Sequence, residues 1–405
     1  MVADEASRGA IERIGILGAG TMGAGIAQVV TEAGLIAVVH DPIAGAYERA
    51  RDRIGGFLAR KVEKGQLSED DAASALARLH PAASLEELAT VDLLVEAIPE
   101  DLELKRGAFR RLDAEAATDS ILASNTSSLS IAQIASAARH PERVVGMHFF
   151  NPVPLMALVE VISGPLTAPE VAEATVAVAR RLGKTPVLAA DTPGFIVNRV
   201  ARPYYLEAMR ILGDGAAGVE EVDQAMRDAG FKMGPFELVD TIGSDVNLAV
   251  SQATYQAFGS DPRYRPHPVQ QMVVDAGRLG RKAGAGFYDY GADGARRAPW
   301  ADLPPTSGPH LSSDRISARI LAALVNEAAS AVADGVASPE AIDTAMRLGA
   351  NYPSGPLAWG ERNGLAGVVA TLDELHSQFP DGRYRVVPLL RDLAERGESF
   401  FPPRA

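Results

Sequence analysis

The sequence predicts an α/β amino-terminal domain with a parallel sheet, followed by two all-helical domains. Up to about residue 190, short apolar runs alternate with longer amphipathic ones, which is the pattern of βαβ units. After Pro193 the segments read as one helix after another, and part of that helical pattern returns later in the chain. The length of 405 residues is enough for two or three domains.

The strands of the first domain are predicted from short apolar runs bounded by polar or glycine-rich turns. They are Arg13–Leu17, Ile36–His40, 92–97, 120–124, Val144–Phe149, Leu158–Ser163 and 185–188. Amphipathic stretches between them predict helices that include 22–33, 43–64 and 129–137.

The carboxyl-terminal half contains a weak internal repeat. Leu206-Glu207-Ala208 returns as Asn326-Glu327-Ala328, and Val222–Met226 returns as Ile342–Met346, both offset by 120 residues. Met233–Phe236 then returns as Ser354–Leu357 with an offset of 121. Between the copies, the composition of 291–312 is rich in glycine and proline, as in linkers. We therefore expect domains at 1–192, 193–290 and 313–405, with a linker at 291–312.

Charge and composition exclude several classes of protein. The formal net charge of −13 disfavours general binding to nucleic acid or to membrane surfaces. The absence of cysteine excludes disulfides and thiolate chemistry, and the histidines show no metal-binding spacing, so no metal is expected. No run approaches the ~20 apolar residues of a membrane span, and the terminus MVADEASRGA lacks a targeting signal, so a cytoplasmic protein is expected.

A glycine-rich loop follows the first predicted strand and opens a helix. In a G-x-G-x-x-G loop the first glycine permits the turn, the second admits a pyrophosphate and the third allows close helix packing. This context predicts a Rossmann-like, dinucleotide-binding domain, although a tight turn without a ligand is the alternative. The predicted cofactor contacts of the loop are Gly18, Gly20, Thr21, Met22 and Gly23.

Asp41 ends the second predicted strand, 21 residues after Gly20. A carboxylate at this point can bond the ribose 2′-hydroxyl and repels a 2′-phosphate. NAD is therefore predicted in preference to NADP.

A run of polar side chains, 124–128, follows the fourth predicted strand. One of these residues is expected to cap the next helix. A cap needs a single oxygen, however, and the carboxyl ends of parallel strands are where such sheets bind ligands.

His148 and Glu160 lie in two strands joined by a turn at Pro154. If these strands pair antiparallel about that turn, the two residues face each other. A carboxylate inside the apolar run Leu158–Ser163 would be costly without a partner. The pair is either structural or a general base, in which the carboxylate orients the imidazole and stabilises its protonated form.

The sequence resembles the L-3-hydroxyacyl-CoA dehydrogenase family over nearly all of residues 12–290. The resemblance rests on six segments in family order, GAGTMG, VEAIPE, SNTSSLSI, HFFNPVPLMALVEV, DTPGFIVNR and MGPFELVDTIG. Residues after 313 resemble the second carboxyl-terminal domain of longer bacterial members, the 3-hydroxybutyryl-CoA and 3-hydroxyadipyl-CoA dehydrogenases. The resemblance implies helical domains like those of 6-phosphogluconate dehydrogenase. It also implies NAD-dependent interconversion of L-3-hydroxyacyl-CoA and 3-oxoacyl-CoA, as in fatty acid β-oxidation.

The resemblance also implies roles for individual residues. His148 would be the general base with Glu160 as its partner, Ser127 would bond the substrate oxygen, and Asn198 would position the substrate. The implied NAD contacts outside the glycine loop are Asp41, Glu100, Lys105, Asn151 and Lys282.

An acyl-CoA partner needs positive charge to hold its phosphates. Arg53, Arg60 and Lys64 share one face of the long helix predicted at 43–64, and the family places CoA along this helix. A solvated basic face that binds nothing is the alternative.

The second helical copy has Ala318 or Arg319 where the first has Asn198, so it is not expected to form a second active site. We expect it to pack against the first copy as an internal pseudo-partner, in a chain that is either a monomer or a homodimer. A dehydrogenase of a free hydroxy or sugar acid, or a non-catalytic crystallin-like NAD-binding protein, are the competing interpretations. The acyl chain length is not readable from the sequence.

Overall fold

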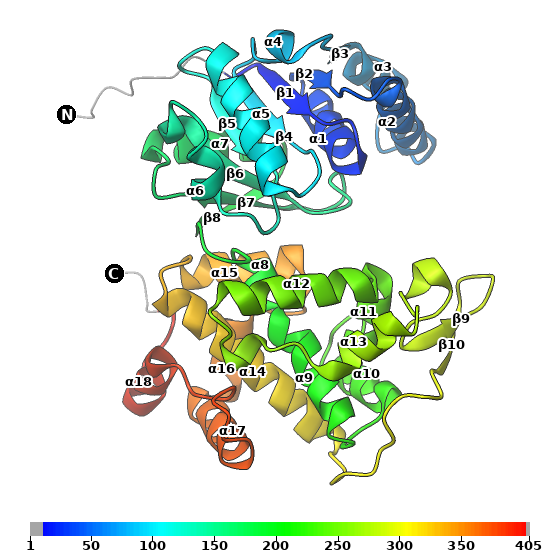
Figure 1. The fold of residues 1–405 in the computed structure, drawn as a ribbon, viewed down its shortest axis with the longest axis vertical. Coiled ribbons are helices and arrows are strands. Elements are labelled where there is room, and N and C mark those ends of the chain that lie inside the picture. Colours follow the sequence, from blue (N-terminus) through cyan, green and yellow to red (C-terminus); the bar gives the residue numbers. More distant parts are fainter. Residues whose placement is uncertain (1–10, 402–405) are drawn as a thin grey trace. The chain divides into compact units, whose positions relative to one another are not determined.

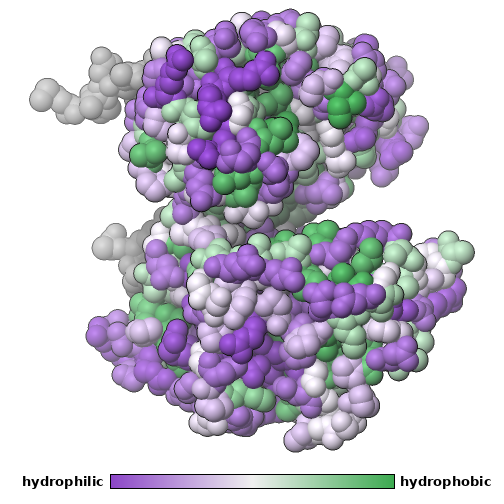
Figure 2. Space-filling model, viewed as in Figure 1, coloured by the Kyte–Doolittle hydropathy of each residue, from purple (hydrophilic) through white to green (hydrophobic). Residues whose placement is uncertain are grey.

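The computed structural model describes residues 11–401, in two compact units that divide between Phe195 and Ile196 (Figure 1). Residues 1–10, for which the sequence predicts no targeting signal, lie outside the described part. On the visible face of each unit, hydrophobic residues form small groups among hydrophilic ones (Figure 2).

The first unit is built on an eight-stranded sheet with the order β3-β2-β1-β4-β5-β6-β7-β8. All neighbouring strands are parallel except β6 and β7, which pair antiparallel. The strands are β1 (Arg13–Leu17), β2 (Ile36–His40), β3 (Leu79–Pro81), β4 (Leu93–Glu96), β5 (Ile121–Ser124), β6 (Val144–Phe149), β7 (Leu158–Ser163) and β8 (Thr185–Ala190). The predicted α/β class is confirmed, and the edge strand β3 is the one that the sequence did not predict.

Helices cover both faces of this sheet because successive strand residues point to opposite sides. Ile16 and Leu17 of β1, for example, belong to different hydrophobic clusters. One cluster includes α1 (Thr21–Glu32), α2 (Ala46–Glu63), α3 (Glu69–Ala77) and α7 (Pro169–Arg181). The other includes α4 (Leu85–Leu88), α5 (Leu102–Glu115) and α6 (Ile131–Ala135), and the 3-10 turn η1 (Pro141–Arg143) precedes β6.

Two predicted helices are shorter than expected. α2 begins at Ala46 instead of residue 43, because Gly45 before it adopts a left-handed conformation with φ 74°. α6 covers 131–135 instead of 129–137, and its cap is Ser130, whose hydroxyl accepts a hydrogen bond from the Gln133 amide. The prediction that a residue of 124–128 caps this helix was therefore wrong.

The second unit is mainly helical. Its first half contains α8 (Val197–Val200), α9 (Arg202–Gly213), α10 (Val219–Asp228), α11 (Pro235–Ile242), α12 (Ser244–Ala257), η2 (Pro262–Tyr264), α13 (Pro268–Asp275) and η3 (Arg281–Ala283). A hairpin of β9 (Tyr288–Tyr290) and β10 (Arg296–Pro299) follows, so the predicted linker 291–312 contains a strand. The second half contains α14 (Ser313–Ala333), α15 (Pro339–Gly349), α16 (Pro356–Asn363), α17 (Leu365–Gln378) and α18 (Pro388–Arg396).

The two halves of this unit repeat the same local structure. Asp223 on α10 accepts hydrogen bonds from the Phe236 and Glu237 amides at the start of α11. Asp343 on α15 does the same for the first amides of α16, those of Leu357 and Ala358. An aspartate thus satisfies the amide groups that a helix start leaves unpaired, at equivalent points of both copies.

Reciprocal ion pairs join the two copies where α14 packs against α9 (Figure 1). Arg199 donates to Glu327 at 2.8 Å, and Arg319 donates to Glu207 at 2.9 Å. Equivalent residues of the two pairs lie 120 positions apart in the sequence: Arg319 corresponds to Arg199, and Glu327 to Glu207. At the same offset, Ala318 corresponds to Asn198. Both glutamates are buried, and each also accepts a tyrosine hydroxyl, from Tyr264 or Tyr384.

α14 qualifies one expectation from the sequence. By length and composition alone it could cross a membrane, with a mean hydropathy of 1.4 over its most apolar stretch. However, 72% of that stretch is buried inside the protein, and the helix carries Arg319 and Glu327 in buried ion pairs. The core helix of a folded unit passes the same test, so α14 is only a weak indication of a membrane span.

Candidate active site

The glycine loop between β1 and α1 has the geometry that a dinucleotide needs. Gly18 has φ 105°, and a Cβ there would lie 2.7 Å from the Ala97 carbonyl oxygen. A Cβ on Gly23 would lie 1.8 Å from the Gly18 carbonyl oxygen, so α1 can pack this closely on the loop only if residue 23 is glycine. The space beside Gly20 is open, with no atom within 4 Å of a Cβ position.

A cavity of about 1080 Å³ lies over this loop. It opens at the carboxyl ends of β1 and β4, where the strand order reverses and where such sheets bind ligands. Its lining includes Gly18, Gly20, Thr21, Met22 and Asp41. The first turn of α1 carries no acidic residue, so nothing in that turn opposes a phosphate at the helix start. These features fit NAD.

Asp41 lines the same cavity and also shapes the loop. Its Oδ2 accepts a hydrogen bond from the Ala19 amide at 2.8 Å, and its Oδ1 accepts one from the Ile43 amide at 2.9 Å. The carboxylate predicted to meet the ribose is therefore fixed by two backbone groups.

His148 and Glu160 are directly opposite each other in the antiparallel pair β6–β7, as the sequence register predicted. The His148 Nδ1 lies 2.6 Å from Glu160 Oε2. His148 is 6% exposed and its ring packs on Phe150, with ring centres 4.4 Å apart, while Glu160 is fully buried. A buried carboxylate thus fixes the orientation of a nearly buried imidazole.

The polar run after β5 is organised around Glu100. The carboxylate accepts hydrogen bonds from Thr126 Oγ1 at 2.7 Å and from the amides of Ser127 and Ser128 at 2.9 and 3.1 Å. Burial raises the pKa of Glu100, but these bonds and the Lys105 ammonium outweigh it and bring the pKa below its ordinary value. Glu100 is therefore ionised at neutral pH and holds Ser127 in place, and its contact with NAD stays a prediction.

Lys105 is 1% exposed and binds carboxylates inside the unit. Its Nζ lies 2.6 Å from Glu96 Oε1 and 3.4 Å from Glu100 Oε2. In this structure Lys105 supports the loop that carries Glu100, and its direct contact with NAD stays a prediction.

Three further residues shape the site, although no sequence pattern had assigned them a role. Glu96 accepts the Ser124 hydroxyl at 2.6 Å, and Asn125 Oδ1 accepts the Phe149 amide at 2.8 Å, beside His148. Asp191 accepts the Ser130 hydroxyl at 2.8 Å and two amides at the start of α6. A carboxylate inside the apolar run of β4 was the only available signal for Glu96. Asn125 lay unassigned within the polar run.

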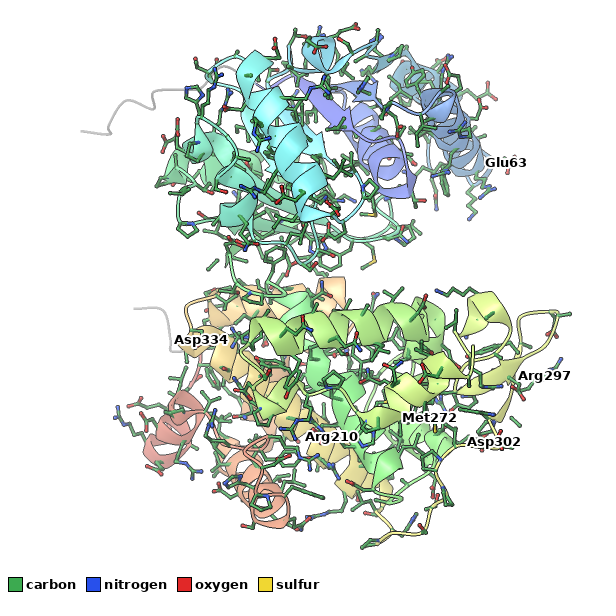
Figure 3. The ribbon with its side chains drawn as sticks, in the orientation of Figure 1. Glu63, Arg210, Met272, Arg297, Asp302 and Asp334 are labelled. Atoms are coloured by element: carbon green, nitrogen blue, oxygen red, sulfur yellow. The ribbon has the colours of Figure 1, made fainter. Side chains whose placement is uncertain are left out.

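A groove of about 240 Å³ brings together residues of α1, α2 and the turn after β6. Its lining includes Thr21, Arg53, Phe57 and Asn151, so three predicted ligand contacts, Thr21, Arg53 and Asn151, meet in one groove. Arg60 lies over the Phe57 ring at 5.6 Å. Lys64 directly follows Glu63, which Figure 3 labels at the end of α2. Arg53, Arg60 and Lys64 are all exposed.

Asn198 and Lys282 belong to the second unit. The Asn198 carbonyl, on α8, accepts a hydrogen bond from Arg202 Nε at 2.9 Å. Lys282, in η3, lies 2.7 Å from both carboxylate oxygens of Asp245. Their roles toward substrate and NAD stay predictions.

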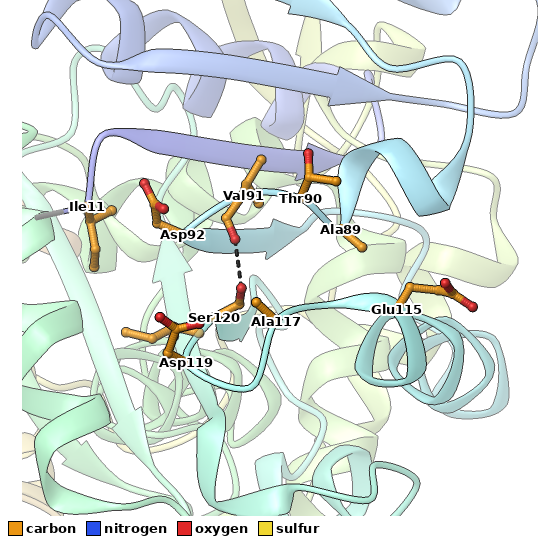
Figure 4. Close-up of a pocket in the computed structure, with 10 residues that line it drawn as sticks. Ile11, Ala89, Thr90, Val91, Asp92, Glu115, Ala117, Asp119 and Ser120 are labelled. Carbon is orange, nitrogen blue, oxygen red and sulfur yellow. Dashed lines mark hydrogen bonds between the residues drawn. The ribbon is translucent and has the colours of Figure 1, made fainter. Parts of the chain in front are cut away.

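A second hollow of the first unit, about 560 Å³, lies at the amino ends of β4 and β5 (Figure 4). Asp92, Glu115 and Asp119 make its lining acidic, and the Ser120 hydroxyl donates to the Val91 carbonyl at 2.8 Å. Its position at the amino ends argues against a role in NAD binding. Within residues 11–401, no cluster of His, Asp and Glu is arranged to hold a metal ion.

Comparison with known proteins identifies the family of both units. The model of the 3-hydroxyacyl-CoA dehydrogenase NAD-binding domain matches residues 13–192. The model of the carboxyl-terminal domain of the same enzymes matches twice, at 194–290 and 316–399. The fold, the glycine loop and these matches define an NAD-dependent oxidoreductase that acts on a CH–OH group.

Individual proteins are similar over nearly all of the chain or over its first two thirds. The 3-hydroxyadipyl-CoA dehydrogenase of Escherichia coli K12 is 38% identical, over 95% of this chain and 98% of its own. A crystal structure of 3-hydroxybutyryl-CoA dehydrogenase from Escherichia coli K12 has a TM-score of 0.89 at 37% identity, covering 96% and 99% of the two chains. The 3-hydroxybutyryl-CoA dehydrogenase of Clostridioides difficile is 41% identical over 69% of this chain and 99% of its own. The chain belongs to the 3-hydroxyacyl-CoA dehydrogenase family.

Proposed function

We propose that this protein interconverts an L-3-hydroxyacyl-CoA and a 3-oxoacyl-CoA with His148 as the general base. The contact between His148 Nδ1 and Glu160 Oε2 is the observation that carries this proposal. Because Nδ1 faces the carboxylate, Nε2 is the ring nitrogen left to accept the proton of the substrate hydroxyl. Glu160 then stabilises the imidazolium that forms.

The chemistry needs one base and one hydride acceptor. The C3 hydroxyl loses its proton to His148 Nε2, and C3 loses a hydride, which leaves a carbonyl. Bound NAD supplies the hydride acceptor. Ser127, held by Glu100, would bond the C3 oxygen, and Asn198 would position the acyl group.

The residues proposed to hold NAD follow from the cavity over the glycine loop. Backbone amides of the loop and the start of α1 would face the pyrophosphate, and Asp41 would face the adenosine ribose. Glu100, Lys105, Asn151 and Lys282 do not line this cavity and are proposed as NAD contacts from the family resemblance alone.

CoA is proposed to lie along the basic face of α2. Arg53 lines the groove beside Asn151, and Arg60 and Lys64 continue the same face away from it. The similar proteins are named for a hydroxybutyryl and a hydroxyadipyl group, so both an uncharged chain and one with a distal carboxylate are candidates for the acyl group.

Two variants test the base. His148→Gln should lower kcat by roughly 10²–10⁴-fold, and Glu160→Gln should lower it by at least about tenfold, because each removes part of the proton-accepting pair. The assay follows NADH oxidation with acetoacetyl-CoA, and NADH binding by fluorescence controls for an intact cofactor site. Near-normal turnover of His148→Gln would remove it from this role.

The substrate class has its own test. Wild-type protein is assayed with acetoacetyl-CoA and with free acetoacetate, each with NADH. We expect turnover of the CoA ester only, because the free acid lacks the phosphates that the basic face would bind. Turnover of the free acid alone would contradict the CoA assignment.

A further inference from the structure

Arg202 is a buried cation without an acidic partner. It begins α9, four residues after Asn198, and is 5% exposed. Its Nε donates to the Asn198 carbonyl, but its Nη1 is buried and has no hydrogen-bond partner among the described residues. The guanidinium lies over the Tyr205 ring at 4.8 Å. Burial lowers the pKa of Arg202, and the other groups that act on it are the tyrosines Tyr205 and Tyr352.

The other buried arginines of the described chain show how unusual this is. Each of them pairs with a carboxylate: Arg143 with Asp113, Arg199 with Glu327, Arg210 with Glu207, and Arg319 with Glu207. A buried charge is costly unless it is paired. Among residues 11–401, Arg202 is the one buried arginine that has no carboxylate partner within the protein. Its charge would therefore be stabilised by an anion from a bound ligand.

Tyr352 is the second unsatisfied donor of this cluster. It lies between α15 and α16, in the second copy, and is 6% exposed. Its ring packs on Tyr204 and Phe231, with ring centres 5.6 and 4.9 Å away, and its hydroxyl has no hydrogen-bond partner among the described residues. The first copy thus supplies a buried guanidinium N–H, from Arg202, and the second copy a buried hydroxyl, from Tyr352. Neither has a hydrogen-bond partner among the described residues.

The loop that carries Tyr352, residues 350–355, has the same length as its counterpart, 229–234, and the extra residue of the second copy lies at the end of α15. The repeat offset is 120 up to Met346 and 121 from Ser354 onward, so one extra residue lies between them. In the same loop Asn351 has φ 55°, a left-handed conformation that asparagine tolerates better than most residues. Gly230 is also left-handed, with φ 97°, at the equivalent point of the first copy, so the backbone is alike and the second copy supplies a tyrosine hydroxyl where the first has Phe231.

We propose that Arg202 and Tyr352 bind the distal carboxylate of a dicarboxylic 3-hydroxyacyl-CoA. This inference rests on the proposed function, in which Asn198 positions the reacting end of the same acyl group. A carboxylate would accept one hydrogen bond from Arg202 Nη1 and one from the Tyr352 hydroxyl, which satisfies both donors and neutralises the buried charge. The second copy would then supply a specificity residue, although it lacks the asparagine of the first.

The test compares two substrates of equal carbon number on the full-length protein. 3-Hydroxyadipyl-CoA has a carboxylate where 3-hydroxyhexanoyl-CoA has a methyl group. We expect wild-type kcat/KM to favour the adipyl ester. Arg202→Met should reduce the ratio of kcat/KM for the adipyl ester to that for the hexanoyl ester by roughly 10²-fold, because the carboxylate loses a charged hydrogen bond. Tyr352→Phe should reduce it by about tenfold, because the carboxylate loses a neutral one.

Tyr384→Phe is the matched control. It removes another buried tyrosine hydroxyl of the second copy, one that donates to Glu207, and should leave the ratio unchanged. If Arg202→Met does not fold, Tyr352→Phe still decides, since it keeps the ring. A wild-type protein without preference, or an equal loss on both esters, would overturn the inference while the proposed function stands. Failure with both CoA esters would overturn the proposed function and this inference with it.

Discussion

Asp41 has a structural role in the glycine loop, and we propose that the same side chain also selects the cofactor. It fixes the glycine loop through the Ala19 amide, and it faces the cavity proposed for the adenosine ribose. Because its charge would repel a 2′-phosphate, the same carboxylate that orders the loop would exclude NADP.

Replacing Asp41 by Asn should relax this cofactor choice. The amide still accepts a hydrogen bond, but the charge that repels a 2′-phosphate is lost. We expect the ratio of kcat/KM with NADPH to that with NADH to rise about tenfold or more. Asp92→Asn is the control, since Asp92 also accepts two backbone amides but lies at the amino end of the sheet. An unchanged ratio in Asp41→Asn would remove this residue from cofactor selection.

His267 makes stability depend on pH. Burial, followed by the nearby Arg210, lowers the pKa of His267 to about 4 from 6.5. Its Nδ1 accepts the Val269 amide at the start of α13, which also requires the neutral ring. The unfolded chain binds a proton near pH 6.5 and the folded one only near pH 4, so the free energy of unfolding falls as pH drops between these values, by roughly 3 kcal/mol in total.

His267→Asn should remove most of this acid sensitivity, because asparagine can cap a helix without titrating. Urea unfolding at about pH 7 and about pH 4.5 measures the difference in free energy of unfolding. We expect that difference to shrink by about 2 kcal/mol relative to wild type. His310→Asn, at an exposed histidine, is the control. The same difference in His267→Asn and wild type would show that His267 is not responsible.

The pairing of residues across two strands was predictable where the alternation of side chains along a strand determines it. The turn at Pro154 and strict strand alternation are enough to place His148 opposite Glu160. The cluster of Arg202 and Tyr352 was not predictable, because its members are brought together by packing of two sequence-distant copies. Likewise, nothing local shows that Lys105 folds back onto Glu96 instead of reaching solvent.

At the scale of elements, α2 is the helix whose proposed role in binding CoA depends on one face. Arg53, Arg60 and Lys64 repeat at seven- and four-residue spacing and are exposed together, while Ile54 and Leu58 are buried in the core of the unit. The helix thus packs by one face and presents positive charge on another.

Removing this charge should weaken CoA binding without slowing the chemistry. The triple variant Arg53→Gln, Arg60→Gln, Lys64→Gln should raise KM for acetoacetyl-CoA roughly tenfold with little change in kcat, and wild-type KM should rise with salt. Arg51→Gln, on the opposite side of the same helix, should leave KM unchanged. A triple variant with normal KM would support a merely solvated face.

Element boundaries were harder to predict than the elements themselves. β1, β2, β6 and β7 have the predicted limits, because each is a short apolar run with clear ends in the sequence. β3 was missed because three residues that include Pro81 carry no alternation. α6 was misplaced because several serines and threonines could cap it, and Asp191, far away in the sequence, favours Ser130.

At the scale of the whole molecule, the second helical copy buries one face of the first, where α14 packs against α9. Glu207 and Glu327 each receive an arginine from the other copy, and Arg210 and Asp334, both labelled in Figure 3, extend the two sets. Without residues 313–405, Glu207 would lose Arg319 and Tyr384, and the apolar side of α9 would lose α14.

Truncation tests whether the second copy replaces a partner subunit. A chain of residues 1–290 should either aggregate or pair with a second copy of itself through α9, because the buried apolar and charged face would otherwise meet water. Light scattering of the truncated and full-length proteins measures this. A well-folded, fully active monomer of residues 1–290 would contradict the expectation.

The reciprocal contacts of α9 and α14 have a consequence for how such a protein changes over time. In a symmetric dimer of identical chains every substitution enters both sides of the interface at once. Here the two sides are encoded separately, so one side can keep Asn198 while the other carries Ala318, and Tyr352 can stand where the first copy has Phe231. Each half can therefore change separately, while the shared ion pairs require the two halves to stay complementary.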